Sequence, residues 1–132
     1  MVNEADFPDG LRYDEHYNWA KVEDNIVVFG ITKHGLEQAS EIAFIELPKK
    51  GQRVEKGKSC GNMESAKWSG EIIAPVSGEI IEVNEGLFNE PERMNKDPYG
   101  EWIAKIKPDN INDINSLMDK AKVIEWLRSK GN

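Results

Sequence analysis

The sequence predicts one small, mostly β domain spanning residues 1–132, with a short helix in its N-terminal half and helices at its C-terminal end. Three observations support this prediction. Short β-branched and apolar runs alternate with Pro and Gly, as strands alternate with turns. One such segment occurs twice around the middle of the chain. A helical pattern of apolar residues occupies only the last part.

The first regular elements lie between residues 25 and 48. The run NIVVFGI (25–31) is β-branched and ends near a glycine, so it predicts a buried strand. The segment 32–42 contains helix-forming residues behind Thr32, a suitable N-cap, and predicts one short helix. The run AFIEL (43–47) predicts a further strand that ends at Pro48.

The repeated segments are PKKGQRVEKG (48–57) and PVSGEIIEVNEG (75–86), and Lys67 lies between them. Each begins Pro-x-x-Gly and continues into an apolar strand and a closing glycine. Two similar β units around one hairpin predict a small sandwich or barrel with approximate twofold symmetry. The alternative is that Pro and Gly mark ordinary turns here.

The C-terminal part combines one strand with a helical region. EWIAKIKP (101–108) alternates apolar and polar residues and predicts a half-buried strand. Apolar residues then recur at helical spacing: Ile114, Leu117, Met118, Ala121, Ile124 and Leu127. We expect this stripe to cover the domain's own core, although it could instead bind a partner. Residues 1–20 and 84–100 lack such periodicity and predict an irregular arm and a solvated acidic loop.

Composition excludes several classes of function. The chain is 39% hydrophobic and 31% charged, with a net charge of −7, which is unfavourable for binding nucleic acid. No apolar run is long enough to span a membrane, and the N-terminus lacks the features of a secretory signal, so we expect a cytoplasmic protein with no membrane partner. The single cysteine, Cys60, excludes an internal disulfide.

Motifs for catalysis or metal binding are also missing. There is no P-loop, GxGxxG, HExxH or CxxC pattern. His16 and His34 are not spaced as metal ligands, and Cys60 resembles a small packed residue more than a nucleophile. We therefore expect no metal site and find no recognised catalytic motif.

The segment ESAKW (64–68) carries the strongest functional signal. It places Lys67 at the predicted meeting point of two strands, with Trp68 beside it. An exposed lysine at a hairpin tip is within reach of another enzyme, and acylation of its amine would display a long flexible arm from a rigid base. The alternative is a solvated surface lysine.

Several motifs together resemble the H protein of the glycine cleavage system, and the resemblance runs from about Asp9 to Leu127. The matching segments are DGLRY (9–13), GIT (30–32), IELP (45–48), ESAKW (64–68), APVSGEIIEVNEGL (74–87), PERMNKDPYGEWIAKIKP (91–108) and the helical tail. The resemblance implies a lipoyl-domain hybrid barrel-sandwich. It also implies a non-catalytic carrier with lipoate in amide linkage on Lys67. Glu64 and Ser65 then match the residues that the lipoylating enzymes meet.

Two positions depart from that family. In the family an acidic residue in a His-Glu-Trp segment lines the cleft that protects a cationic aminomethyl cargo, but here Asn18 occupies its position. Glu15 lies nearby and could supply the missing charge. Trp68 replaces a small residue, and its ring can stack on the lipoyl group or contact its sulfur, so we expect it to bind the cofactor. The segment KWSG (67–70) resembles paralogues that bind lipoate in heterodisulfide-reductase-like sulfur oxidation. Methionines flank the lysine of biotin carriers, whereas here Ala66 and Trp68 do, which disfavours biotin.

These departures lead to a predicted pathway with two alternatives. The prediction is a monomeric lipoyl carrier that shuttles an intermediate for a heterodisulfide-reductase-like complex. The first alternative is the glycine cleavage H protein, serving glycine decarboxylase, aminomethyltransferase and dihydrolipoyl dehydrogenase. The second is a relay that passes lipoate to other complexes. All three require a lipoate ligase or lipoyl transferase as a partner.

Overall fold

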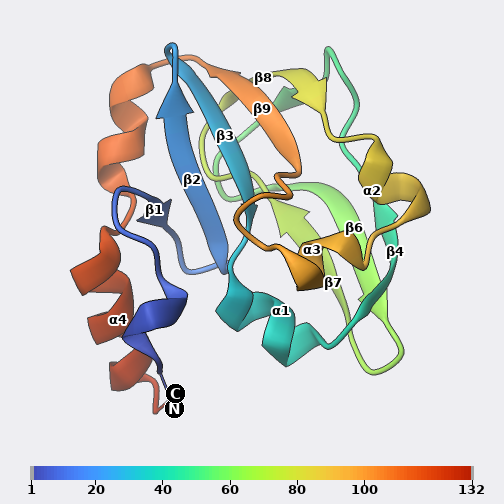
Figure 1. Ribbon diagram of the computed structural model, residues 1–132. Coiled ribbons are helices and arrows are strands. Elements are labelled where there is room, and N and C mark those ends of the chain that lie inside the picture. The colour runs from blue at the N-terminus through green and yellow to red at the C-terminus, as the bar shows by residue number, and fades with distance from the viewer. Residues whose placement is uncertain (1, 132) are drawn as a thin grey trace.

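The structure, a computed structural model, describes residues 2–131 and contains two antiparallel sheets with short helices around them (Figure 1). The larger sheet has the strand order β1-β2-β3-β9-β8-β5. Its strands are β1 (Arg12–Tyr13), β2 (Asn18–Glu23), β3 (Ile26–Ile31), β5 (Arg53–Val54), β8 (Gly78–Val83) and β9 (Ala104–Pro108). The smaller sheet consists of β4 (Ile42–Glu46), β6 (Ser59–Ser65) and β7 (Ser69–Ile73), in the order β4-β6-β7. The prediction of a mostly β fold is confirmed.

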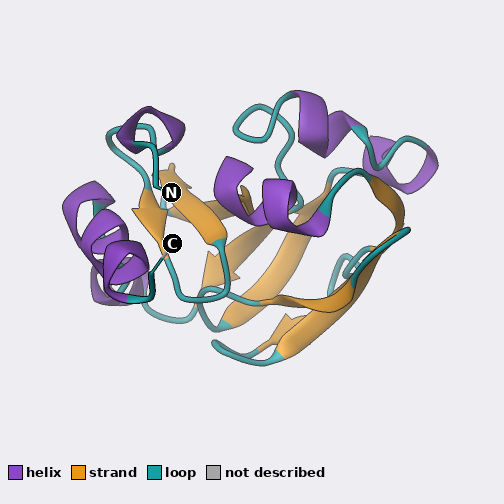
Figure 2. Ribbon diagram, turned by 90° about the horizontal axis from the view of Figure 1, so that it is seen from below, coloured by secondary structure: helices purple, strands orange, loops and turns teal. Residues whose placement is uncertain are grey.

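The helices are all short. They are the 3-10 helices η1 (Glu4–Asp6) and η2 (Ile111–Ser116) and the α-helices α1 (Lys33–Ala39), α2 (Gly86–Asn89), α3 (Arg93–Lys96) and α4 (Lys120–Ser129). Figure 1 shows α4 beside β1, on the opposite side of the molecule from α2 and α3. The helices gather along one side and at one end, which leaves the outer face of the small sheet uncovered by helices (Figure 2).

Two clusters of buried side chains hold these elements together. The larger contains residues from both sheets, such as Phe29, Ile45 and Ile72, so it joins the sheets face to face. The second lies around Trp19 and Leu127, between the large sheet, α4 and the N-terminal arm. Burial of such aliphatic and aromatic side chains is the main source of stability in a domain of this size.

The N-terminal half follows the predicted order of elements. The Thr32 hydroxyl accepts a hydrogen bond from the Gly35 N–H and caps α1, as expected from the sequence. The predicted irregular arm is only partly irregular, because residues 12–13 and 18–20 belong to β1 and β2. β1 has only two residues, and β2 begins with three consecutive buried residues, Asn18, Trp19 and Ala20, so neither strand shows an alternating pattern.

The two repeated segments lie side by side in the large sheet, since β5 pairs with β8 through Arg53↔Glu79 and Val54↔Gly78. Gly78 is required for close approach between strands: a Cβ atom there would lie 2.1 Å from the Lys107 carbonyl oxygen of β9. Pro-x-x-Gly thus marks a tightly packed strand entry in the second copy, whereas in the first copy Gly51 lies in open space with a φ of 89° and serves the turn.

The predicted acidic loop over residues 84–100 is wrong. This segment contains α2 and α3, and its apolar residues Leu87 and Met94 are fully buried. Each helix has four residues and one buried anchor, so neither produces a periodic pattern in the sequence. The C-terminal stripe divides between η2 and α4, with Asp119 as the N-cap of α4, and most of it packs on the protein's own core as expected. Ala121 is the exception, because it is exposed and Val123 is buried instead.

Candidate functional site

The β6–β7 hairpin places Lys67 at its tip. Glu64 pairs with Ser69, and the Ser65 N–H donates a hydrogen bond of 2.8 Å to the Trp68 carbonyl oxygen. Only Ala66 and Lys67 remain between these paired ends. The loop is therefore short and its base is fixed on both sides by the sheet.

The Lys67 side chain is exposed and makes no hydrogen bond or ion pair with any residue in the range 2–131. Its backbone N–H donates to the Ser65 hydroxyl oxygen at 3.3 Å, which orients the turn. An open hollow of about 380 Å³ adjoins it, lined by Glu64, Ser65, Lys67, Trp68 and Ser69. An exposed amine on a fixed turn suits acylation by another enzyme, because no buried charge or ion pair has to be broken.

Trp68 folds back over the following strand. A Cβ atom on Gly70 would lie 2.2 Å from the indole Cζ2 atom, so the ring occupies the space above the Gly70 backbone. The residue is nevertheless 38% exposed. Trp68 therefore forms a partly open aromatic surface directly beside the root of the lysine side chain.

The outer face of the small sheet continues from the hairpin and is acidic. Phe44 pairs with Glu64 across β4 and β6, and the ring is 47% exposed. A hollow of about 520 Å³ beside it is lined by three carboxylates, from Glu46, Glu64 and Glu71, and by no basic residue. An enzyme that reaches Lys67 over this face meets a negative potential.

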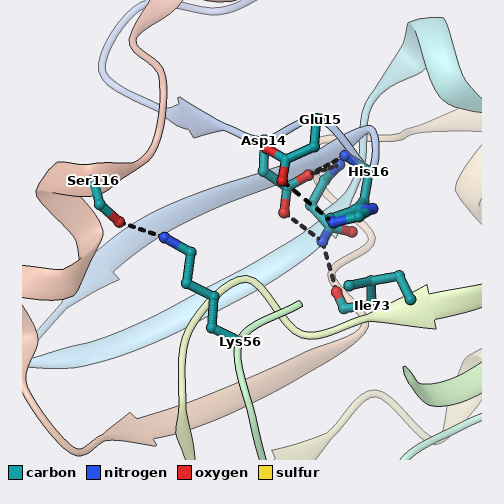
Figure 3. Close-up of polar contacts among 7 residues, drawn as sticks. Asp14, Glu15, His16, Lys56, Ile73 and Ser116 are labelled. Atoms are coloured by element: carbon teal, nitrogen blue, oxygen red, sulfur yellow. Dashed lines mark hydrogen bonds and ion pairs between the residues drawn. The ribbon is translucent and has the colours of Figure 1, made fainter. Parts of the chain in front are cut away.

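Asn18 lies elsewhere, in a buried cluster that joins the two sheets, beside Asp14 and Ile73, which Figure 3 labels. Its side chain is 1% exposed, and its Nδ2 donates to Asp14 Oδ2 at 2.9 Å and to the Ile73 carbonyl oxygen at 2.7 Å. Its Oδ1 is buried without a hydrogen-bond partner among the residues described. Asn18, at the start of β2, thus links the C-terminal end of β7 in the small sheet to the large sheet.

Asp14 is a site residue that the sequence analysis missed. Its side chain is 5% exposed, and Oδ1 accepts hydrogen bonds from the backbone N–H groups of His16 (2.8 Å) and Asn18 (3.0 Å). Burial raises the pKa of Asp14, although the hydrogen bonds from Asn18 and His16 act in the opposite direction. The local signal was an Asp that opens a tight turn before a strand, closed by Tyr17 at a φ of 67°.

Glu15 does not join this cluster. It is exposed, and its carboxylate contacts the His16 ring at 3.4 Å (Figure 3). Lys56, in the same view, donates to the Ser116 hydroxyl oxygen and makes no contact with the carboxylates drawn. The structure therefore brings Asn18 together with Asp14 and not with Glu15.

The hairpin and the Asp14–Asn18 cluster share strand β7. Ile73, which Asn18 contacts, is four residues from Ser69, or about 13 Å along the strand. A group attached to Lys67 would have to lie back along β7 to approach Asp14.

We also searched the described part of the chain for a metal site, a reactive cysteine and a membrane-spanning helix. No group of three or more His, Cys, Asp or Glu side chains within it is placed to hold a metal ion. Burial raises the pKa of the Cys60 thiol to about 12, which leaves it unreactive near neutral pH. No helix among these residues is long and apolar enough to cross a membrane.

Comparison with known proteins identifies the family of this chain. The sequence profile of the family described as "Glycine cleavage H-protein" matches residues 11–130. The chain is 47% identical over 130 residues to a probable glycine cleavage system H protein of Pyrococcus abyssi, covering 97% of both chains. It is 41% identical over 116 residues to the glycine cleavage system H protein of Acinetobacter baumannii, covering 87% of this chain and 94% of the relative.

A solved structure agrees with this result. The crystal structure of a glycine cleavage system H protein from Mycobacterium marinum matches with a TM-score of 0.83 and 30% identity, over 96% of this chain and 100% of that one. These matches favour the glycine cleavage alternative, and the sulfur-oxidation prediction finds no support in them. The chain belongs to the glycine cleavage H-protein family, whose members are non-catalytic carriers of lipoate attached to a lysine.

Proposed function

We propose that this protein carries lipoate on Lys67 and transfers the aminomethyl group from glycine decarboxylase to aminomethyltransferase. The observation that carries the proposal is the position of Lys67: it is exposed, without a partner among residues 2–131, in a two-residue loop whose base is hydrogen-bonded. Glu64 and Ser65 form the approach to that loop and are the contacts we assign to the lipoylating enzyme.

The residues present fit an amide-linked arm. Acylation removes the charge of the Lys67 amine, and no ion pair with the described residues is lost. The Ser65–Trp68 hydrogen bond fixes the root of the arm, while the lysine methylenes supply reach. When attached, lipoate supplies a cyclic disulfide that can be opened by reduction and can hold a group on sulfur. Tethering raises the effective concentration of that group at each partner enzyme.

The Asp14–Asn18 cluster supports the glycine cleavage role over a neutral cargo. The sequence suggested that a cationic cargo would lack an opposing charge, because Asn18 stands in the family's acidic position. Asp14 supplies a carboxylate 2.9 Å from the Asn18 amide nitrogen. An acidic side chain therefore lies next to the family's position, but it is buried and already hydrogen-bonded, so it can act on a cargo only through its electrostatic field and not by direct contact.

The partners follow from the family. The H-protein family implies glycine decarboxylase, aminomethyltransferase and dihydrolipoyl dehydrogenase, together with a lipoate ligase or lipoyl transferase. We also propose that residues 1–132 act as one domain, since both sheets share a core cluster, and that this domain acts as a monomer.

The test compares the wild-type protein with Lys67→Arg and with Lys58→Arg, a control at another exposed lysine. After treatment with a lipoate ligase and lipoate, intact mass should rise by one lipoyl group for the wild type and Lys58→Arg but not for Lys67→Arg. The lipoylated wild type should then support exchange of labelled bicarbonate into glycine by glycine decarboxylase. Lipoylation of Lys67→Arg would overturn the site, and absence of exchange with the modified wild type would overturn the glycine role.

A further inference from the structure

The indole ring of Trp68 packs against the backbone of Gly70, two residues further along the hairpin. Its indole lies over Gly70, where even a methyl group would approach Cζ2 to 2.2 Å and Cη2 to 2.4 Å. The absence of a side chain at position 70 thus creates the space that the ring fills. In the structure the ring therefore lies against the backbone of the hairpin.

The rest of the ring is available for contact. Trp68 is 38% exposed, and its Nε1 donates no hydrogen bond to any residue in the described range. It borders the open hollow that Lys67 also lines. An aromatic surface that is backed by the sheet and open on its outer side can bind an apolar or polarisable group with little loss of conformational entropy.

We propose that Trp68, seated on Gly70, is a resting platform for the dithiolane ring at the end of the Lys67 arm. This inference rests on the proposed lipoylation of Lys67. The ligand class is a small cyclic disulfide, whose sulfur atoms contact aromatic rings favourably at about 5 Å. The platform adjoins the root of the arm, so the flexible chain has to fold back on itself to reach it.

The size of the effect follows from sulfur–aromatic contacts in general. Their usual strength corresponds to a preference of about twofold to tenfold for the docked arm over the free arm. The arm then rests near the hairpin for most of the time and remains free enough to enter a partner's active site. Opening the ring to a dithiol lowers the preference, because the compact apolar ring is lost.

The test uses NMR of the indole N–H groups in the full chain. The four tryptophans give four such signals, and Trp68→Phe identifies the one from Trp68. We expect nuclear Overhauser contacts between the Trp68 ring and the dithiolane protons in the lipoylated wild type. Protein carrying an octanoyl group on Lys67 is the matched control, since it has the same amide and no sulfur, and its Trp68 signal should shift less.

A second variant tests the role of Gly70 without altering the tryptophan. In Gly70→Ala the added methyl group displaces the ring, whose outer end is exposed, so the fold is retained and the contacts with the dithiolane should disappear. Trp126→Phe removes a distant tryptophan in α4 and should leave them unchanged. Contacts that persist in Gly70→Ala, or equal shifts for octanoyl and lipoyl protein, would overturn the platform.

The two proposals can fail separately. Intact mass reports lipoylation of Lys67 whether or not the arm rests on Trp68. Full lipoylation of the wild type without contacts to the Trp68 ring refutes the platform and leaves the carrier role standing. Absence of lipoylation at Lys67 refutes both.

Discussion

Replacing Asn18 by Glu, the acidic residue that the family resemblance implies at this position, should destabilise this protein at neutral pH. Asn18 is buried, and its Nδ2 donates to the Asp14 carboxylate and to the Ile73 carbonyl oxygen. A glutamate has no donor when ionised, so it would oppose both acceptors. The substitution that restores the family's residue thus places two carboxylates side by side in a buried position.

The magnitude can be worked out in two ways. Two unit charges about 4 Å apart repel by about 4 kcal/mol at the effective dielectric constant of protein sites near a surface. Uptake of one proton relieves this repulsion, at a cost at pH 7 of about 3.7 kcal/mol for a glutamate with an ordinary pKa near 4.3. Loss of the bond to Ile73 adds about 1 kcal/mol. We expect a loss of about 3–5 kcal/mol in the free energy of unfolding at pH 7.

The pH dependence has a definite sign. Mutual repulsion raises the pKa of the pair in the folded state, and burial already raises the pKa of Asp14 in the wild type. The folded state then binds a proton that the unfolded state does not, so stability falls as the pH rises through this window. At pH 5 proton uptake costs only about 1 kcal/mol. The difference from the wild type should therefore shrink to about 1–2 kcal/mol at pH 5.

Urea unfolding at pH 5 and pH 7, followed by tryptophan fluorescence, measures both quantities. Asn18→Gln is the matched control, because it has the length of glutamate but remains neutral and keeps a donor. Its cost should not change between the two pH values. Adding Asp14→Asn to Asn18→Glu should remove the pH dependence. Equal destabilisation by Glu and Gln at both pH values would refute the contact between positions 14 and 18.

Three further predictions concern other parts of the molecule. Gly78→Ala should cost about 1–3 kcal/mol or more in urea unfolding, because the new Cβ would lie 2.1 Å from the Lys107 carbonyl oxygen; a variant as stable as the wild type would contradict the tight β8–β9 contact. Iodoacetamide at pH 8 should label Cys60 rapidly in urea and very slowly in the native protein, since a pKa of about 12 leaves about one thiol in ten thousand ionised; rapid native labelling would count against its burial. Lipoylated and unmodified protein should melt within about 4 °C of each other in calorimetry, because Lys67 lies outside both core clusters, and a larger gap would show that the arm packs into the fold.

The sequence alone was sufficient for features that depend on a few neighbouring residues. The strand NIVVFGI, the Thr32 cap of α1 and the hairpin with an exposed Lys67 are all local, because each follows from backbone preferences and turn residues within about ten positions. The motif ESAKW with its surroundings also led to the correct family. Trp68 and Asn18, read without their neighbours, led to a preference for the sulfur pathway that the comparisons do not support.

The tertiary structure decided the features that join distant residues. Asn18 contacts Ile73, 55 positions away, and it is this contact, with Asp14, that buries the amide and places a carboxylate beside it. Leu87 and Met94 are buried because the fold brings them into the larger core cluster, although neither belongs to a periodic pattern in the sequence. The need for glycine at position 70 is visible only in the structure, where the indole of Trp68 occupies the space that a side chain would take. Such contacts depend on how chain segments pack in space, and packing is a property of the whole fold that no single stretch of sequence contains.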